Sequence, residues 1–313
     1  MLEGKILIIG AAGQIGESLC DALSDKYGNE NVIGTDIRPN DHIHNRFEKL
    51  DVLDVDHLER EISTNNITQI YHLAAILSAK GEQNPLKTWQ FNMQSWFNVL
   101  EASRKFSVKK VFYPSSIAVY GDDAIKNPAS QEVILHPNTV YGISKVAGEN
   151  WIKYYRSKYD LDIRSLRFPG IIGYSAPPGG GTTDYAVDIF HQAIQFGKYD
   201  CFLKADTMLP MMYMDDAIRA IMELMDAKKE KIANSLAYNI AGCSFTPDDI
   251  FLEIKKHLPN FEINYRPDFR QNIADTWPQV IDDVQARTDW GWNPKFDLKN
   301  IVKDMLFHLS YKH

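Results

Sequence analysis

The sequence is poor in cysteine, has no long apolar run and carries no excess of basic charge. Its three cysteines, Cys20, Cys201 and Cys243, are too few and too scattered for a disulfide framework or a zinc site. No apolar stretch approaches the roughly 20 residues that a membrane span requires. The net charge is −7 and the basic residues are dispersed, so we expect neither a membrane nor a nucleic acid among the partners.

The same features favour a reducing compartment, and we predict a cytoplasmic location. A strand is expected from Lys5 onward, which leaves no room before it for a signal peptide. A mature organellar enzyme without its transit peptide would have the same composition, so that location stays open. His42 and His44 have the spacing of metal ligands, but the polar stretch around them lacks cysteine, and we predict a surface loop and no metal site.

The stretch KILIIGAAGQIG predicts a buried strand that turns directly into a helix. Its apolar first part ends at Gly10, and Gly13 and Gly16 then open a segment with helical spacing of apolar residues. Glycines allow a sharp turn and close approach of a ligand, and the free amides at a helix start bind phosphate. A glycine triplet alone also occurs in ordinary turns, so the strand before it and the helix after it carry the interpretation.

Asp36 ends the next expected strand, which starts near Asn31. A carboxylate at this place accepts hydrogen bonds from both ribose hydroxyls of NAD and repels the 2′-phosphate of NADP. Arg38 is close enough in sequence to receive such a phosphate, which keeps NADP as an alternative. We predict NAD as the cofactor.

Short apolar strands and amphipathic helices continue to alternate along the chain, which predicts an α/β fold with a Rossmann-type doubly wound parallel sheet. We expect the NAD-binding domain over residues 1–170, rejoined by a strand at 236–241. Residues 171–313 are expected to form mainly a smaller C-terminal substrate domain and its closing loops, including Trp277, Trp290 and Trp292. Ligands bind at the carboxyl ends of parallel strands. Residues expected there are Gly10, Asp36, Asp51, Ala74, Ala75, Ser115, Ser116 and Pro169.

Tyr141 and Lys145 are four residues apart in a helical pattern, which places both side chains on one helix face. An ammonium beside a phenol is expected to lower the pKa of the tyrosine from its usual ~10 and to make it a usable base. An isolated pair of this kind is more often an ordinary surface pair. Here the strand over 109–113 runs into Ser115 and Ser116, whose hydroxyls can hold a substrate oxygen near Tyr141.

Together with Asp36, the motifs GAAGQIG, DV at Asp51, HLAA at His72, PSSIAVYG at Ser116, YGISK at Tyr141 and RFPGIIG at Arg167 resemble the extended short-chain dehydrogenase/reductase family. The resemblance covers nearly the whole chain, in family order. It implies that Tyr141 is the catalytic acid/base, that Lys145 lowers its pKa and binds the nicotinamide ribose, and that Ser116 orients the substrate oxygen.

Strand ends and resemblance together predict a set of cofactor contacts. Asn92 belongs to this set by resemblance, as a structural and proton-relay residue of a helix, and a helix N-cap is an equally open interpretation. The predicted contacts are Gly10, Gly13, Gln14, Ile15, Gly16, Asp36, Asp51, Val52, Leu73, Ala74, Ala75, Asn92, Tyr141, Lys145 and Pro169.

Four further stretches, LSAKGE, PGGGTTDYAV, DTWPQVIDD and DWGWNPKFDL, resemble the branch of this family that oxidises L-threonine at its β-carbon. The resemblance implies L-threonine or a similar β-hydroxy amino acid as substrate. Hydroxyls and amides of the glycine-rich loop suit a zwitterion, although Thr182, Thr183 and Asp184 can also cap the following helix. The implied pocket residues are Ser78, Ser116, Tyr141, Thr182, Thr183, Asp184 and Trp277.

The residues leave alternatives open for the activity and for the oligomeric state. A nucleotide-sugar epimerase or dehydratase that holds NAD tightly is the alternative activity, whereas a non-catalytic NAD-binding protein would not need Ser116, Tyr141 and Lys145 together. Resemblance implies a homodimer through helices around 89–106 and 144–158, but apolar residues there can equally be covered within one chain. The product would suit capture by a 2-amino-3-oxobutanoate CoA ligase.

Overall fold

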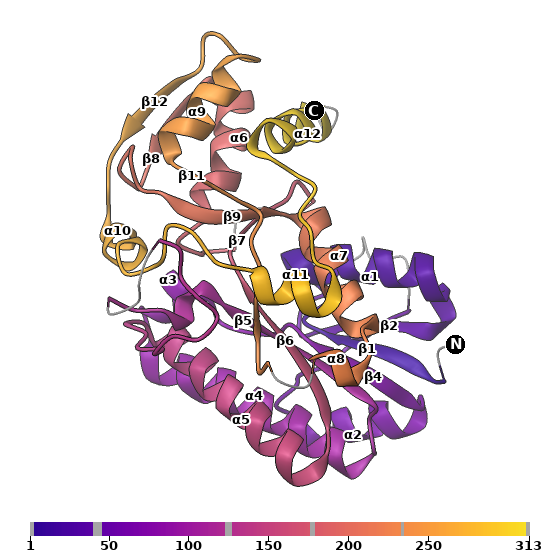
Figure 1. Cartoon of the computed structure of the whole chain (residues 1–313). Helices are drawn as coiled ribbons and strands as arrows, with labels where there is room; N and C mark the ends of the chain where they lie inside the picture. The colour runs from indigo at the N-terminus through magenta and orange to yellow at the C-terminus, as the bar shows by residue number, and fades with distance from the viewer. Residues whose placement is uncertain (1–2, 40–45, 123–126, 176–178, 233–234, 311–313) are drawn as a thin grey trace.

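A seven-stranded parallel sheet forms the centre of the larger part of the molecule, in the order β10-β6-β5-β4-β1-β2-β3 (Figure 1). The computed structural model describes residues 3–39, 46–122, 127–175, 179–232 and 235–310. The predicted Rossmann-type α/β fold is confirmed. The strands are β1 (Lys5–Ile9), β2 (Val32–Asp36), β3 (Arg46–Lys49), β4 (Ile67–His72), β5 (Lys110–Ser116), β6 (Asp162–Phe168) and β10 (Tyr238–Asn239).

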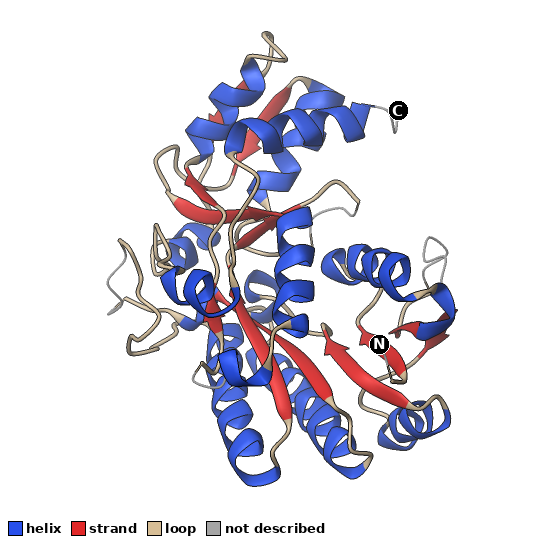
Figure 2. Cartoon of the chain, turned by 45° about the vertical axis from the view of Figure 1, so that its right-hand side comes forward, coloured by secondary structure: helices blue, strands red, loops and turns tan. Residues whose placement is uncertain are grey.

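Helices cover both faces of this sheet because its strands are apolar on both sides (Figure 2). In β1, Ile6 and Ile8 pack into the core on one face, and Leu7 and Ile9 pack into the core on the other. The first core is closed by α1 (Gln14–Tyr27) and α7 (Met214–Asp226). The second is closed by α2 (Val55–Thr64), α4 (Pro85–Lys105) and α5 (Val140–Tyr159).

A smaller unit lies above the carboxyl end of the sheet in the view of Figure 1 and has its own core. Two small sheets order its strands as β11-β9-β7 and β12-β8. Its elements are β7 (Gly170–Ile172), α6 (Tyr185–Phe196), β8 (Lys198–Cys201), β9 (Leu209–Tyr213), β11 (Cys243–Phe245), α9 (Pro247–Lys255), β12 (Glu262–Tyr265), α10 (Phe269–Ala274) and α12 (Leu298–Ser310). Shorter elements of the chain are η1 (Asn29–Asn31), α3 (Ser78–Gly81), η2 (Ile117–Val119), α8 (Lys229–Ile232) and α11 (Val284–Trp290).

The second half of the chain contributes to both cores. Trp277 lies in the core of the smaller unit, whereas Trp292 lies in the sheet core together with α7, and Trp290 packs against it. The three tryptophans that were expected together in the closing unit are therefore divided between two cores. Sequence spacing groups them, but each indole packs where its own local element lies.

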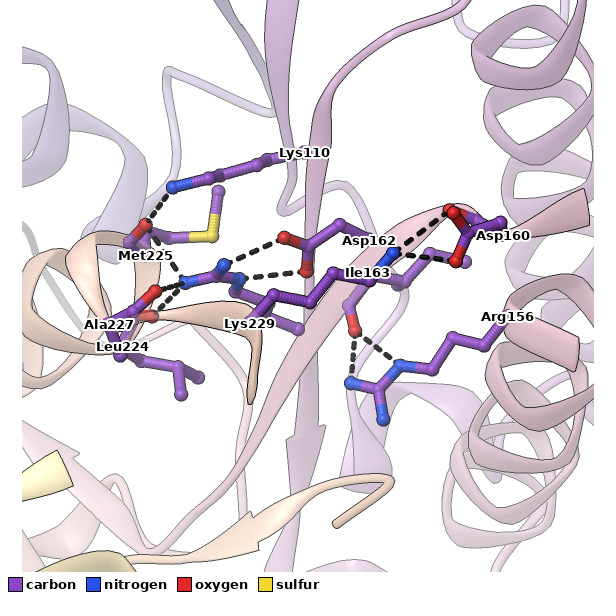
Figure 3. Close-up of polar contacts among 10 residues, drawn as sticks. Lys110, Arg156, Asp160, Asp162, Ile163, Leu224, Met225, Ala227 and Lys229 are labelled. Atoms are coloured by element: carbon purple, nitrogen blue, oxygen red, sulfur yellow. Dashed lines mark hydrogen bonds and ion pairs between the residues drawn. The ribbon is translucent and has the colours of Figure 1, made fainter. Parts of the chain in front are cut away.

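A buried arginine, Arg164, fastens α7 to the sheet, and Figure 3 labels its partners Asp162, Leu224, Met225 and Ala227. Arg164 on β6 is 1% exposed and pairs with Asp162 through two hydrogen bonds of 2.9 and 2.7 Å. Its Nη1 also donates to carbonyls at the C-terminal end of α7, and Lys110 donates to one of them at 2.7 Å. The positive charges of Arg164 and Lys110 also interact favourably with the negative C-terminal end of the α7 dipole. The carbonyls that accept from Arg164 belong to Leu224, Met225 and Ala227.

In the part of the chain that the structure describes, no helix has the length and apolar character needed to cross a membrane.

Candidate active site

The first part of the site is the turn between β1 and α1. Gly10 has φ +90°, and a Cβ on it would lie 2.7 Å from the amide nitrogen of Ala74. A Cβ on Gly16 would lie 2.3 Å from the carbonyl oxygen of Gly10, so neither position accepts a side chain without backbone movement. Gly13 is the N-cap of α1 and offers no side chain to its amides. Gln14, Ile15 and Gly16 thus start a helix whose first amides are open to an anion.

Asp36 ends β2 beside this turn and is 7% exposed. Its carboxylate accepts hydrogen bonds from the backbone amides of Ala12 at 3.2 Å and Arg38 at 3.0 Å. The Arg38 guanidinium turns back onto the same carboxylate at 3.4 Å and onto the carbonyl of Ala12. A buried carboxylate with the nearby arginine bound to it fits the ribose hydroxyls of NAD and disfavours a 2′-phosphate. The turn and the acid together therefore fit the dinucleotide.

Other predicted cofactor residues follow the neighbouring strands. Leu73, directly after β4, donates to the carbonyl of Ile9 at 2.8 Å, and Ala74 and Ala75 continue the same loop beside Gly10. These positions, like those after β3 and β6, lie at the carboxyl edge of the sheet. Asp51 there is exposed, whereas Val52 and Pro169 are buried.

Asn92 is not a helix N-cap, so that interpretation is wrong. It lies inside α4, whose N-cap is Asn84. Its amide group bonds both backbone groups of Ile76, at 2.8 and 3.1 Å, and donates to the hydroxyl of Ser144 on α5 at 3.3 Å. Asn92 therefore ties the loop after β4 to α5. Its contact with a cofactor remains a prediction.

Ser116, Tyr141 and Lys145 come together at the carboxyl end of β5. Ser116 is the last residue of β5, and Tyr141 and Lys145 lie on the first two turns of α5. Ser116 interacts with the Tyr141 hydroxyl. The ammonium of Lys145 lies 5.4 Å from the centre of the Tyr141 ring. It donates to the carbonyl of Pro114 at 2.6 Å.

The expected lowering of the pKa of Tyr141 by Lys145 is wrong for this structure. Burial raises the pKa of Tyr141 to about 12, against a small lowering by Ser116, and burial lowers the pKa of Lys145 to about 7. Both shifts have the same cause, because a buried site disfavours the charged form of each group. The hydrogen bond of Lys145 goes to Pro114, so the ammonium does not offset the burial of the phenol.

Two predicted pocket hydroxyls connect the two parts of the molecule. Ser78 on α3 and Thr182 in the glycine-rich loop are buried, and their oxygens lie 3.3 Å apart. Thr183 is half-buried, next to Gly170. Trp277 packs in the core of the smaller unit, and Tyr141 packs against the same core. Trp277 and Tyr141 therefore meet the same core, which belongs to the smaller unit.

Asp184 organises the glycine-rich loop. It occupies the N-cap position of α6 but makes no side-chain bond to that helix, so the helix-cap interpretation is wrong for its side chain. Its Oδ2 accepts from the amides of Gly180 at 2.7 Å and Gly181 at 2.8 Å. Burial raises the pKa of Asp184, and the loop amides oppose this shift. One carboxylate oxygen is thus engaged by the loop.

Two glutamates near Tyr141 and Lys145 were not predicted from the sequence, Glu149 on α5 and Glu82 at the start of that helix. Glu149 is buried and lies one turn beyond Lys145, at a spacing that continues the face of Tyr141 and Lys145. Glu82 accepts from the amide of Val140 at 2.9 Å, where α5 starts. The helical spacing was a usable signal for Glu149, whereas Glu82 reaches α5 only through the fold.

The described residues hold no group of three or more His, Cys, Asp or Glu side chains that could bind a metal. His42 and His44 lie outside the described residues.

Comparison with known proteins adds a family to this geometry. Residues 6–241 match the NAD dependent epimerase/dehydratase family. The chain is 44% identical to an uncharacterised epimerase/dehydratase of Staphylococcus haemolyticus, over 98% of both chains. It is 43% identical to the mitochondrial L-threonine 3-dehydrogenase of Bos taurus, over 98% of this chain and 83% of the bovine one.

Solved structures agree with this. A partial consensus L-threonine 3-dehydrogenase superposes with a TM-score of 0.97 at 51% identity, covering 98% of this chain and 99% of the other. The holo form of a GalE-like L-threonine dehydrogenase from Cupriavidus necator gives 0.94 at 50%, covering 97% and 99%. A monomeric L-threonine 3-dehydrogenase from a metagenome gives 0.96 at 46%, covering 98% and 99%.

Proposed function

Because the chain belongs to the NAD-dependent epimerase/dehydratase family, we propose that it oxidises L-threonine at its β-hydroxyl, with NAD as acceptor. The products are 2-amino-3-oxobutanoate, NADH and a proton. The observation that carries the proposal is that Ser116, Tyr141 and Lys145 meet at the carboxyl end of β5, on the same edge of the sheet as the glycine turn that follows β1. The full-length likeness to proteins named threonine dehydrogenases selects the substrate.

The protein's own residues supply the proton chemistry. NAD, when bound, accepts the hydride that leaves the β-carbon. Tyr141 takes the proton of the substrate hydroxyl, and Ser116 holds the same oxygen. Gly10, Gly13 and Gly16 admit the diphosphate, and Asp36 binds the ribose.

Tyr141 and Lys145 act as one titrating pair. The first proton leaves the pair near the pKa of Lys145, about 7. Above that pH one proton remains, either on the phenol or on the amine, and the form with a phenolate and an ammonium is the base. The rate of hydride transfer should therefore rise with pH through about 7.

The amino-acid part of the substrate is held from the glycine-rich loop. The hydroxyls of Ser78, Thr182 and Thr183 can bond its carboxylate, and the Asp184 carboxylate can accept from its ammonium. Trp277 closes the apolar side of the pocket. Closure of the smaller unit would exclude water from the hydride path.

The chain is proposed to act as a homodimer in the cytoplasm. Apolar side chains of α4 and α5 are exposed in the single chain, with Trp89 38%, Trp151 36% and Tyr154 42% exposed. Such a surface suits a second copy. One of the similar structures, from a metagenome, is described as monomeric, so the oligomeric state has to be measured. Sedimentation velocity tests it, and a single species with the mass of one chain would contradict the dimer. We also propose that a 2-amino-3-oxobutanoate CoA ligase captures the product.

NADH absorbance tests the activity directly. Purified protein is mixed with NAD and L-threonine, with L-serine and L-allo-threonine as controls. Steady NADH formation that is fastest with L-threonine is expected. No turnover with any of the three, together with NAD that is released only on denaturation, would instead indicate a nucleotide-sugar epimerase or dehydratase.

A further inference from the structure

A buried ion pair lies directly behind the catalytic residues. Arg167 at the end of β6 donates to Glu149 on α5 through two bonds, 2.9 Å from Nε to Oε1 and 2.8 Å from Nη2 to Oε2. The two side chains are 7% and 3% exposed. The hydroxyl of Ser115 donates to the same Oε1 at 2.6 Å. Glu149 therefore has both oxygens engaged and joins α5 to two neighbouring strands.

Ser115 connects this ion pair to the catalytic groups through the backbone. It lies between Pro114, whose carbonyl holds Lys145 at 2.6 Å, and Ser116, which meets Tyr141. Besides the contact of Ser116 with Tyr141, hydrogen bonds from Lys145 to Pro114 and from Ser115 to Glu149 thus join strand β5 and helix α5. Loss of the bond between Ser115 and Glu149 would free residues 114–116, which position both Lys145 and Tyr141.

Arg167 is itself held in a fixed orientation. Its Nη1 donates to the carbonyl of Gln131 at 3.1 Å and to Oδ1 of Asn239 at 3.3 Å. Asn239 lies on β10 and accepts from the hydroxyl of Tyr120 at 2.6 Å through the same atom. The guanidinium fork therefore meets Glu149 in one geometry, as bidentate pairing requires.

We propose that Glu149, held by Arg167, is a positioning residue for proton transfer, which acts on Tyr141, Ser116 and Lys145 through Ser115 and through its own negative charge. This inference rests on the proposed oxidation of threonine and adds residues to it. Glu149 contacts none of the reacting atoms in this role. Its effect is to hold β5 and α5 in fixed relative positions and to favour the protonated form of Lys145.

The charges around Lys145 support the electrostatic part. The groups that face it are His72 from β4, Tyr113 from β5, and Tyr141 and Glu149 from α5, with Arg167 of β6 behind Glu149. Burial keeps His72 neutral, because it lowers the pKa of its ring to about 3. Among these groups Glu149 supplies the negative charge that raises the pKa of Lys145 against burial. Glu149 therefore favours the protonation state in which Tyr141 is a phenolate and Lys145 is an ammonium.

The first test is Ser115→Ala, which removes the hydrogen bond from Ser115 to Glu149 and leaves both bonds between Arg167 and Glu149. Its matched control is Ser165→Ala, a buried serine on the adjacent strand whose hydroxyl has no hydrogen-bond partner in the described structure. We expect kcat to fall roughly tenfold in Ser115→Ala, because small displacements of reacting groups are costly. The KM for threonine and the Kd for NAD should match those of the control, while the Tm should fall by a few degrees because a buried bond to a carboxylate is lost.

The second test is the pH profile of kcat in Glu149→Gln. Loss of the negative charge lowers the pKa of Lys145, so the pair loses its first proton at lower pH, and the rising limb should move down by about one pH unit. The plateau should also fall, because the remaining proton then favours the phenol. Glu149→Asp keeps the charge and should keep the midpoint of the wild type. A residue that only stabilised the fold would lower the Tm and leave this midpoint unchanged.

The outcomes separate this inference from the proposed function. Turnover of threonine by the wild type, with kcat in Ser115→Ala equal to the control and an unmoved limb in Glu149→Gln, overturns the inference alone. If Ser115→Ala does not fold, the position of the rising limb in the pH profile of Glu149→Gln decides. No turnover by the wild type overturns the proposed function. The NMR signal of the Lys145 side chain, assigned by its loss in Lys145→Met, then reports the same midpoint shift without substrate, and an unmoved midpoint overturns the inference.

Discussion

Strand β6 carries two buried arginines, Arg164 and Arg167, whose surroundings differ. Both are paired bidentately with a carboxylate, Asp162 for the first and Glu149 for the second. Arg164 lies near the start of the strand and donates to the last carbonyls of α7. Arg167 lies at the end of the strand, where Glu149 also meets Ser115 beside the catalytic residues.

The difference follows from position in a parallel sheet. At the amino ends of the strands an arginine can only fasten neighbouring elements, as Figure 3 shows for α7. At the carboxyl ends the same kind of pair adjoins the ligand site. We therefore expect substitutions at the first end to reduce stability and substitutions at the second to reduce turnover. Four changes test this division.

The largest effect is expected at the carboxyl end, from Tyr141→Phe. Without the phenol no group accepts the substrate proton, and kcat should fall by about 10³-fold or more. NAD affinity, measured by calorimetry, and the Tm should stay at the wild-type values. Substantial residual turnover would remove Tyr141 from the role of base.

Arg164→Ala should show the opposite pattern. It leaves Asp162 without its partner and removes one donor to the carbonyls at the end of α7, which should lower the free energy of unfolding by about 3–5 kcal/mol. Urea unfolding at 25 °C measures this, and kcat per folded enzyme should not change. Arg164→Lys keeps a charge but not the fork and should lose less. A large fall in kcat with unchanged stability would contradict the division between the two ends.

His72 gives the carboxyl end a pH-dependent contribution to stability. Burial lowers the pKa of His72 in the folded protein to about 3, below the usual ~6.5, so between these values the unfolded chain binds the extra proton. Stability is therefore lost as pH falls below about 6.5. Between pH 7 and 5.5 the wild type should lose about 1 kcal/mol more unfolding free energy than His72→Phe, which keeps an aromatic ring against Trp96. Equal losses would show that His72 does not titrate in this way.

The smallest effect is expected from Thr183→Ala in the glycine-rich loop. Loss of one hydroxyl contact should raise the KM for threonine roughly threefold to fivefold. Steady-state kinetics at saturating NAD measures it, and kcat and the KM for NAD should remain nearly constant. An equal rise in the KM for NAD would place Thr183 on the cofactor side.

Motifs read from the sequence were sufficient for the fold class, the glycine turn, Asp36 and the group of Ser116, Tyr141 and Lys145. These signals are local, since a strand, a tight turn and one helix face are each encoded within a few residues. The interpretation of Asn92 as a helix cap failed for the opposite reason, and Asp184 occupies the N-cap position of α6 without bonding that helix through its side chain. Their partners, Ile76 and the amides of Gly180 and Gly181, are chosen by loops whose course the local pattern does not encode.

By itself the sequence determined a doubly wound parallel sheet and the cofactor class, because hydrophobic period and glycine placement act over short distances. Only the tertiary structure decided how the catalytic groups titrate. Neighbouring positions on one helix predicted that Lys145 would lower the pKa of Tyr141, yet burial raises that pKa and the ammonium is bound by Pro114. The roles of Arg164 and Arg167 were likewise decided by tertiary structure, since burial and long-range partners arise only when distant segments pack together.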